Sequence, residues 1–287
     1  MKNFDKIYDQ YYKKFGITAD ILPEFLAVKF GLKKALSFTI ASRKEFDKHY
    51  PLIKNICAKS KLWIDYVASK KNRHDFNILI SKRKLNIIND DKDQNESNRF
   101  SYPSCCIKSF NIRTHSYYFT NNIKKLLIDQ DTFDFRLNPF LINSPFHLYS
   151  HLPCSLHCEE TLTYATKLLN ITKRYNKTLY SHIVYFNKTF GLYLDICGMC
   201  LLFKGKLADG QINYKDFYPR KLYENRVRQS KRDSIESSNL FREICQALSE
   251  GNKFTLRDNK LIIKKNRKIV QIFEKPGRLY WKIIKFI

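Results

Sequence analysis

Tyr102-Pro103-Ser104-Cys105-Cys106 and His151-Leu152-Pro153-Cys154-Ser155-Leu156-His157-Cys158 place four cysteines of this 287-residue chain in two tight pairs. In each stretch a proline turn and a capping residue precede a segment with helical spacing, which predicts that a helix begins there. The N–H groups and the positive dipole end of a helix N-terminus favour thiolate over thiol. Two such helix ends brought together would form a metal or redox site, so we expect the two pairs to meet in space.

The spacing within each pair leaves the type of site open. Cys154 and Cys158 would share one face of a regular helix, whereas the neighbours Cys105 and Cys106 would diverge. The alternatives are a mononuclear zinc site, an iron–sulfur cluster, a two-metal arrangement, thiol chemistry with an attacking and a resolving cysteine, and plain burial of four small hydrophobic residues. If the helix ends activate thiols, at least one of Cys105 and Cys154 should react with an alkylating reagent faster than Cys57 or Cys245 at mildly acidic pH, once any metal is removed.

The two stretches resemble a poorly characterised microbial domain family with the pattern Tyr-Pro-x-Cys-Cys followed by His-x-Pro-Cys-Ser-x-x-Cys. The resemblance covers roughly residues 100–170. Ser101 departs from the pattern, because the family usually has glycine before the tyrosine. The resemblance implies a site at the four cysteines and no particular reaction.

Histidines lie close to the second cysteine pair. His151 and His157 are candidates to complete a metal site, and Glu159 or a histidine would serve for proton transfer if the protein is an enzyme. His147 has weaker support, since Pro153 interrupts the helix that would align it with the cysteines. Cys57 and Cys245 are expected in the core. Cys197 and Cys200 form a Cys-x-x-Cys inside an expected strand, where residues three apart face opposite sides, so packing is the favoured role.

The pattern along the chain predicts an α+β protein, in which a helical cysteine module precedes a mainly antiparallel β region. The expected parts are a mixed segment over 1–88, a polar linker over 89–99, the module over 100–178 and a β-rich region over 179–287. The expected helices cover 4–15, 24–30, 42–57 and 237–250. Strands are expected over 62–67, 76–80, 182–187, 191–203 and 212–218, with a hairpin over 254–273 and a docked apolar end over 279–287.

Composition limits the class of protein. The sequence has no apolar run long enough to span a bilayer and no secretory signal pattern, so we expect a cytoplasmic protein with free thiols. Neither a phosphate-binding glycine loop nor a classical hydrolase motif is present. The 52 basic residues against 27 acidic ones give a formal net charge of +25, which fits a nucleic acid or an acidic protein as partner, or simply a solvated cationic surface.

Two functions remain at this stage. In one, the four cysteines hold an iron–sulfur cluster or another thiophilic metal in a redox or maturation enzyme of unknown reaction. In the other, they form a structural zinc unit in a basic protein that binds RNA or DNA. The phosphate contacts would then come from a basic stretch, namely Lys221, Arg226, Arg228, Lys231 and Arg232.

Overall fold

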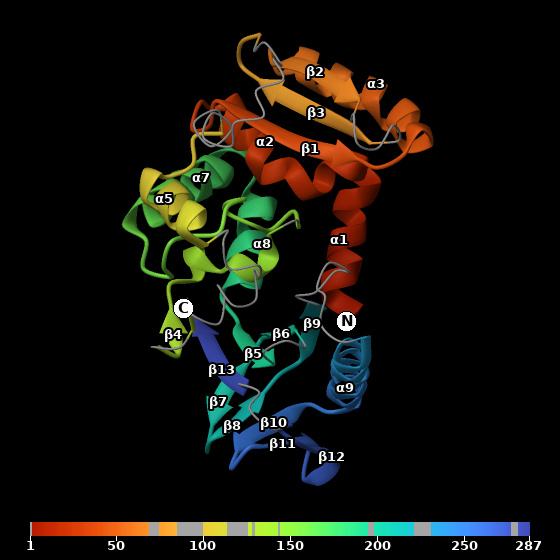
Figure 1. Cartoon of the computed structure of the whole chain (residues 1–287), viewed down its shortest axis with the longest axis vertical. Helices are drawn as coiled ribbons and strands as arrows, with labels where there is room; N and C mark the ends of the chain where they lie inside the picture. Colours follow the sequence, from red (N-terminus) through yellow and green to blue (C-terminus); the bar gives the residue numbers. More distant parts are fainter. Residues whose placement is uncertain are drawn as a thin grey trace.

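The computed structural model describes residues 2–68, 75–84, 100–113, 126–127, 130–142, 144–194, 198–220, 231–276 and 281–287. Three parts follow one another along the long axis of the molecule in Figure 1: a small sheet with its helices, a helical middle part with the paired cysteines, and a strand-rich part. The α+β class is therefore confirmed. The expected linker over 89–99 lies outside the described residues, as do Cys197, Lys221, Arg226 and Arg228.

The N-terminal part is a three-stranded antiparallel sheet that α3 covers on one face (Figure 1). Its helical elements are α1 (Lys2–Phe15), η1 (Gly16–Ile21), α2 (Leu22–Lys29) and α3 (Arg43–Lys59), and its strands are β1 (Ala35–Ile40), β2 (Trp63–Ala68) and β3 (Phe76–Ser81), in the order β1-β3-β2. Ser42 caps α3 as expected, because its side chain accepts a hydrogen bond from the Glu45 N–H. Cys57 is buried in the core between α3 and the sheet, which confirms its predicted role.

The middle part contains the cysteines and the largest hydrophobic core. Its elements are α5 (Ser104–Arg113), β4 (Thr132–Phe133), the short helices η2 (Phe135–Leu137) and η3 (Pro139–Leu141), α7 (Glu159–Tyr175) and α8 (Lys177–Asn187). The buried stripe expected after Cys158 is present on α7, where Ala165, Leu168 and Leu169 join that core. Residues 151–158, by contrast, are irregular, so the helix expected to begin at Pro153 begins only at Glu159.

The expected strand over 182–187 is wrong, because these residues belong to α8. Asn176 caps this helix through a hydrogen bond that its side chain accepts from the Leu179 N–H. Leu179, Ile183 and Phe186 recur at helical spacing and are fully buried in the core of the middle part. Helical packing of this face therefore outweighs the local preference of its β-branched and aromatic residues for strands.

The C-terminal part consists of two five-stranded sheets with α9 (Lys231–Glu250) packed beside them. One sheet has the order β4-β13-β5-β6-β9, with β5 (Phe190–Leu194), β6 (Met199–Phe203), β9 (Asp216–Arg220) and β13 (Trp281–Phe286). The other has the order β12-β11-β10-β8-β7, with β7 (Lys206–Ala208), β8 (Gln211–Asn213), β10 (Lys253–Arg257), β11 (Lys260–Lys265) and β12 (Lys268–Glu274).

Three strand predictions need correction here. The range 191–203 contains two strands, β5 and β6, rather than one. The range 212–218 contains parts of β8 and β9, which belong to different sheets. The range 254–273 contains three strands rather than the two of a hairpin. The expected docking of the last apolar segment is confirmed. β13 lies between β4 and β5, parallel to the first and antiparallel to the second. Within the described part of the chain, no helix is long and apolar enough to cross a membrane.

Candidate metal centre

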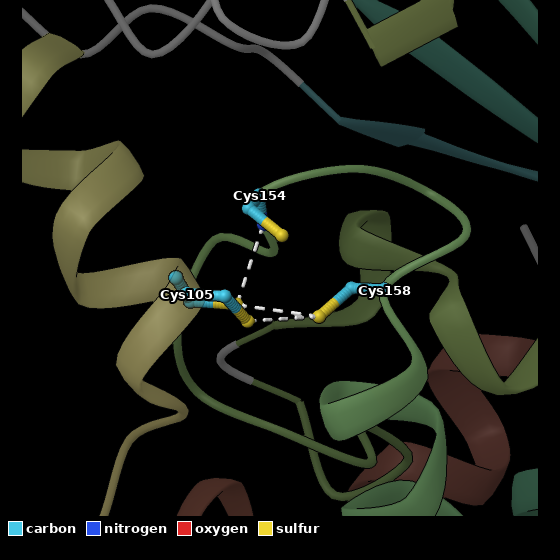
Figure 2. Close-up of side chains that lie close together, drawn as sticks. Cys105, Cys154 and Cys158 are labelled. Atoms are coloured by element: carbon cyan, nitrogen blue, oxygen red, sulfur yellow. Dashed lines mark hydrogen bonds between the residues drawn. The ribbon is translucent and has the colours of Figure 1, made fainter.

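The two cysteine pairs meet in space, as the sequence predicts. The Sγ atoms of Cys105 and Cys158 lie 3.6 Å apart, those of Cys106 and Cys158 3.6 Å, and those of Cys105 and Cys106 3.8 Å. With Cys154 included, all four Sγ atoms lie within 4.8 Å of one another. Figure 2 shows the side chains of Cys105, Cys154 and Cys158 directed toward one another from α5, from the loop and from the start of α7.

The first pair comes from the beginning of α5. The helix starts directly after Pro103, whose carbonyl accepts the Ile107 N–H at 3.0 Å. Ahead of it, Ser101 adopts a φ of +56°, in the left-handed region that glycine favours. Serine therefore adopts at this position a backbone conformation that glycine would adopt without strain. The Ser101 hydroxyl also accepts the Lys34 N–H at 3.3 Å.

The second pair comes from the loop before α7 and from its N-cap. Cys158 itself is the N-cap residue, and its Sγ accepts the Thr161 N–H at 3.4 Å. Cys154 lies in the irregular loop, where its N–H donates to the Cys106 Sγ at 3.3 Å. An N–H bond to sulfur stabilises negative charge on it, so the loop and the helix end both favour thiolates here.

Thr161 links the thiols to a histidine. Its hydroxyl lies 3.2 Å from the Cys158 Sγ, 3.3 Å from the Cys106 Sγ and 2.9 Å from the His151 Nε2. Because the hydroxyl has one hydrogen, a bond donated to sulfur requires it to accept the His151 Nε2–H. His151 is thus a neighbour of the thiol group and not a member of it. Burial lowers the pKa of His151 to about 4, so its ring is neutral near pH 7.

The thiols of this group differ in acidity. Burial, followed by the hydrogen bond to Cys158, raises the pKa of the Cys105 thiol, and burial raises that of Cys106 to about 12. Burial also opposes ionisation of Cys158, but hydrogen bonds from Thr161, together with those from Cys105 and Cys106, lower the pKa of this thiol. These pKa directions favour a thiolate at Cys158 over one at Cys105. The faster reaction of Cys105 or Cys154 compared with Cys57 or Cys245 stays a prediction.

The other sequence-based candidates lie elsewhere. His157 is exposed and packs beside the Phe133 ring at 5.7 Å, and His147 is buried next to Glu24. Cys200 is buried in the C-terminal core, 3.9 Å from the Cys245 Sγ, outside the four-thiol group as expected. Of the basic stretch, Lys231 and Arg232 start α9, but their side chains lie outside the described ones.

Sequence reasoning missed Thr161 and the buried pair Glu24 and Lys33. Thr161 follows Cys158 by three residues, the spacing at which an N3 residue bonds the N-cap side chain, so this signal was available in the sequence. Nothing in the local pattern around Glu24 and Lys33 marks them, because their pairing depends on how α2 and the residues after it pack.

A closed group of four thiols between a helix and a loop is the class of site that holds a metal ion in small protein modules. Residues 59–185 match a family model described as a protein of unknown function (DUF483), and this range includes all four cysteines and α7. The resemblance seen in the sequence thus agrees with a domain whose family description names no activity. Comparison with curated proteins and with solved structures gives no match.

Proposed function

We propose that this protein binds a single, tetrahedrally coordinated metal ion through Cys105, Cys106, Cys154 and Cys158, and that zinc is the ion. The observation that carries the proposal is the close approach of the sulfurs: the Sγ atoms of Cys105, Cys106 and Cys158 lie 3.6 to 3.8 Å apart, and all four Sγ atoms lie within 4.8 Å of one another. Four sulfurs at about 2.3 Å from a tetrahedral ion lie about 3.8 Å from one another. A polynuclear iron–sulfur cluster would hold its cysteine sulfurs further apart, since iron and sulfide atoms lie between them.

The donor set supports a structural role for the ion. Four protein ligands fill a tetrahedral shell, whereas catalytic zinc sites keep one position for water or substrate. Raised thiol pKa values, such as that of Cys106, describe the metal-free protein. A bound cation removes those protons outright, so binding would release protons and would weaken as the pH falls.

The packing of α5 indicates what such an ion would hold together. Among the α5 side chains that the structure describes, Ser104 to Ser109, only Cys106 is buried. None of these residues belongs to the three hydrophobic clusters found in the described part of the chain. The thiols therefore connect the start of α5 with the loop and with α7. A bound ion would join these three segments through metal–sulfur bonds.

Metal analysis joined to X-ray absorption tests the proposal. We expect one zinc per chain with four sulfur neighbours at about 2.3 Å. Cys154→Ser should lose the ion or replace one sulfur by oxygen, whereas the control Cys245→Ser should keep four sulfurs, because that cysteine lies outside the group. Iron with inorganic sulfide would support the cluster instead, and a metal-free protein that ignores added zinc would refute metal binding.

Chelation tests the structural role separately. Removing an ion present at about 1,000 times its dissociation constant should lower the free energy of unfolding by about 4 kcal/mol. Hydrogen exchange should speed up first in α5, while α3, which packs on the N-terminal sheet, stays protected. Uniform acceleration in both helices, or none in either, would contradict a local structural role.

A further inference from the structure

A pocket of about 580 Å³ lies in the strand-rich part, at the end of the molecule opposite the N-terminal sheet (Figure 1). Its walls are the connection from β6 to β7, the connection from β8 to β9 and the residues that enter β10. Pockets of this volume hold small ligands in many proteins. None of its lining residues is acidic, and four of them are lysines, namely Lys204, Lys206, Lys215 and Lys253.

Two of these lysines belong to a polar row across the sheet with the order β12-β11-β10-β8-β7. Lys206 on β7 is directly opposite Asn213 on β8. Asn213 is in turn opposite Lys253 on β10, which is opposite Lys264 on β11. Paired residues point to the same face of a sheet, and Phe254, next in β10, is buried on the other face. Because neighbouring strands lie about 4.8 Å apart, the row gathers three ammonium groups on the outward face.

No carboxylate neutralises these charges. Within the described part of the chain, four lysines at this place form no ion pair and no side-chain hydrogen bond: Lys206, Lys215, Lys253 and Lys264. Lys253 and Lys264 are direct cross-strand neighbours, and like charges in that position destabilise a sheet. The Lys204 Nζ lies 5.8 Å from the Tyr185 ring centre, a contact that leaves its charge in place. A bound anion would relieve this repulsion.

Close packing fixes the walls of the pocket. A methyl group at Gly205 would lie 2.6 Å from the Cδ2 of the buried Phe190, so a side chain there would push the connection away from β5. The Asn252 side chain donates to the Asn266 Oδ1 at 2.9 Å and accepts the Asn266 N–H at 2.8 Å. These walls are therefore in place before a ligand arrives, which lowers the entropy cost of binding.

We propose that this pocket binds a compact anion with two or three linked phosphate groups. Each ammonium group has three hydrogens to donate and a flexible stem, so lysines from several strands can converge on one phosphate chain. The Asn213 amide adds donors, since it has no hydrogen-bond partner among the described residues. An extended nucleic-acid strand fits less well, because sites for such strands offer aromatic rings to the bases. Tyr214, the aromatic lining residue, is buried and donates its hydroxyl to the Leu248 carbonyl at 2.7 Å.

Tripolyphosphate and adenosine triphosphate are the probes that test this binding, with inorganic phosphate and adenosine for comparison. Binding to the full chain is measured by calorimetry and by chemical-shift titration at constant ionic strength, and the metal content is determined before and after. We expect saturable one-to-one binding of both triphosphates, at least about tenfold weaker binding of inorganic phosphate, and none of adenosine. Equal affinity for the two triphosphates would identify the phosphate chain itself as the ligand, and tighter binding of adenosine triphosphate would identify a nucleotide.

A double variant separates this site from the general attraction of anions to a chain with a net charge of +25. Lys206→Gln with Lys253→Gln removes two ammonium groups from the pocket and should weaken tripolyphosphate binding about tenfold or more. The matched control is Lys54→Gln with Lys167→Gln, which makes the same change of charge at exposed positions of α3 and α7 and should leave binding intact. Because repulsion from Lys264 is relieved, the pocket variant should unfold at no lower urea concentration than the unchanged chain.

Three results would overturn the proposal. Equal losses of affinity in the two double variants would mean that the net charge alone attracts the anions. A pocket variant that unfolds in much less urea would assign these lysines a structural role. The third result is a single-stranded oligonucleotide that binds more tightly than tripolyphosphate and loses this affinity only in the pocket variant, which would make the surface a nucleic-acid groove.

Discussion

Replacing Thr161 by valine tests how much its hydrogen bond to cysteine sulfur contributes to metal binding, because the variant keeps all four cysteines. The substitution keeps the shape of the side chain and the Thr161 N–H, but removes a hydroxyl that lies 3.2 Å from the Cys158 Sγ and 2.9 Å from the His151 Nε2. A hydrogen bond to a charged acceptor contributes about 1.5–3 kcal/mol. Zinc affinity should therefore fall about 10- to 100-fold, the usual cost of losing a residue that supports a metal ligand.

The measurement is a competition titration of zinc against a chromophoric chelator, together with urea unfolding of the metal-free protein. The unfolding data are needed because Thr161→Val also leaves the buried His151 Nε2 unpaired, which should lower the stability of the metal-free protein by about 1–3 kcal/mol. Thr163→Val is the matched control, since Thr163 is exposed on the same helix. Equal zinc affinities for the two variants would refute the idea that Thr161 stabilises the Cys158 thiolate.

Three further predictions concern other parts of the chain. Ser101→Gly should raise the free energy of unfolding by about 0.5–1 kcal/mol in urea, because it relieves a positive φ, unless the lost bond to Lys34 offsets the gain. The pKa of Glu24 is about 2 in the folded chain against 4.5 in a free side chain. Its charged carboxylate should therefore stabilise the fold fully above pH 4.5, and this stabilisation should disappear as the pH falls toward 2. Acid unfolding of Glu24→Gln should lack this pH-dependent loss of stability. If the protein binds RNA or DNA, its affinity should fall steeply as the salt concentration rises. Neutralising the basic stretch should make this salt dependence weaker, as measured by filter binding with an unrelated protein of equal charge as the reference. The stretch comprises Lys221, Arg226, Arg228, Lys231 and Arg232.

The helices that begin at strong local signals could be predicted from the sequence. Ser42 before α3 and Gly16 after α1 mark ends that the structure keeps, since capping and chain reversal depend on a few neighbouring residues. The strands of the C-terminal half could not be divided correctly. The run over 191–203 is apolar throughout, so periodicity does not reveal where β5 ends and β6 begins.

The sequence predicts the four cysteines of the candidate metal centre, but it misplaces the start of the helix on which their hydrogen bonds depend. Two cysteine pairs, each behind a proline, suffice to suggest that the pairs meet. The start of α7 at Glu159, however, makes Cys158 the N-cap, and the hydrogen bonds that it accepts there from Thr161 lower the pKa of its thiol. The pairing of Glu24 with Lys33 and His147 depends on tertiary packing between α2 and a segment more than a hundred residues away, which no local pattern encodes.

The position of β13 in the middle of its sheet affects how this chain can fold during synthesis. β4 and β5 are synthesised before the strand that pairs with both of them. β13 follows β5 only after roughly 90 more residues, so the contacts of β13 with β4 and β5 have a high contact order. Until then both strands expose unpaired backbone edges, which attract other nascent chains. The sheet can therefore close only after β13 has been made, and pairings of such high contact order form slowly.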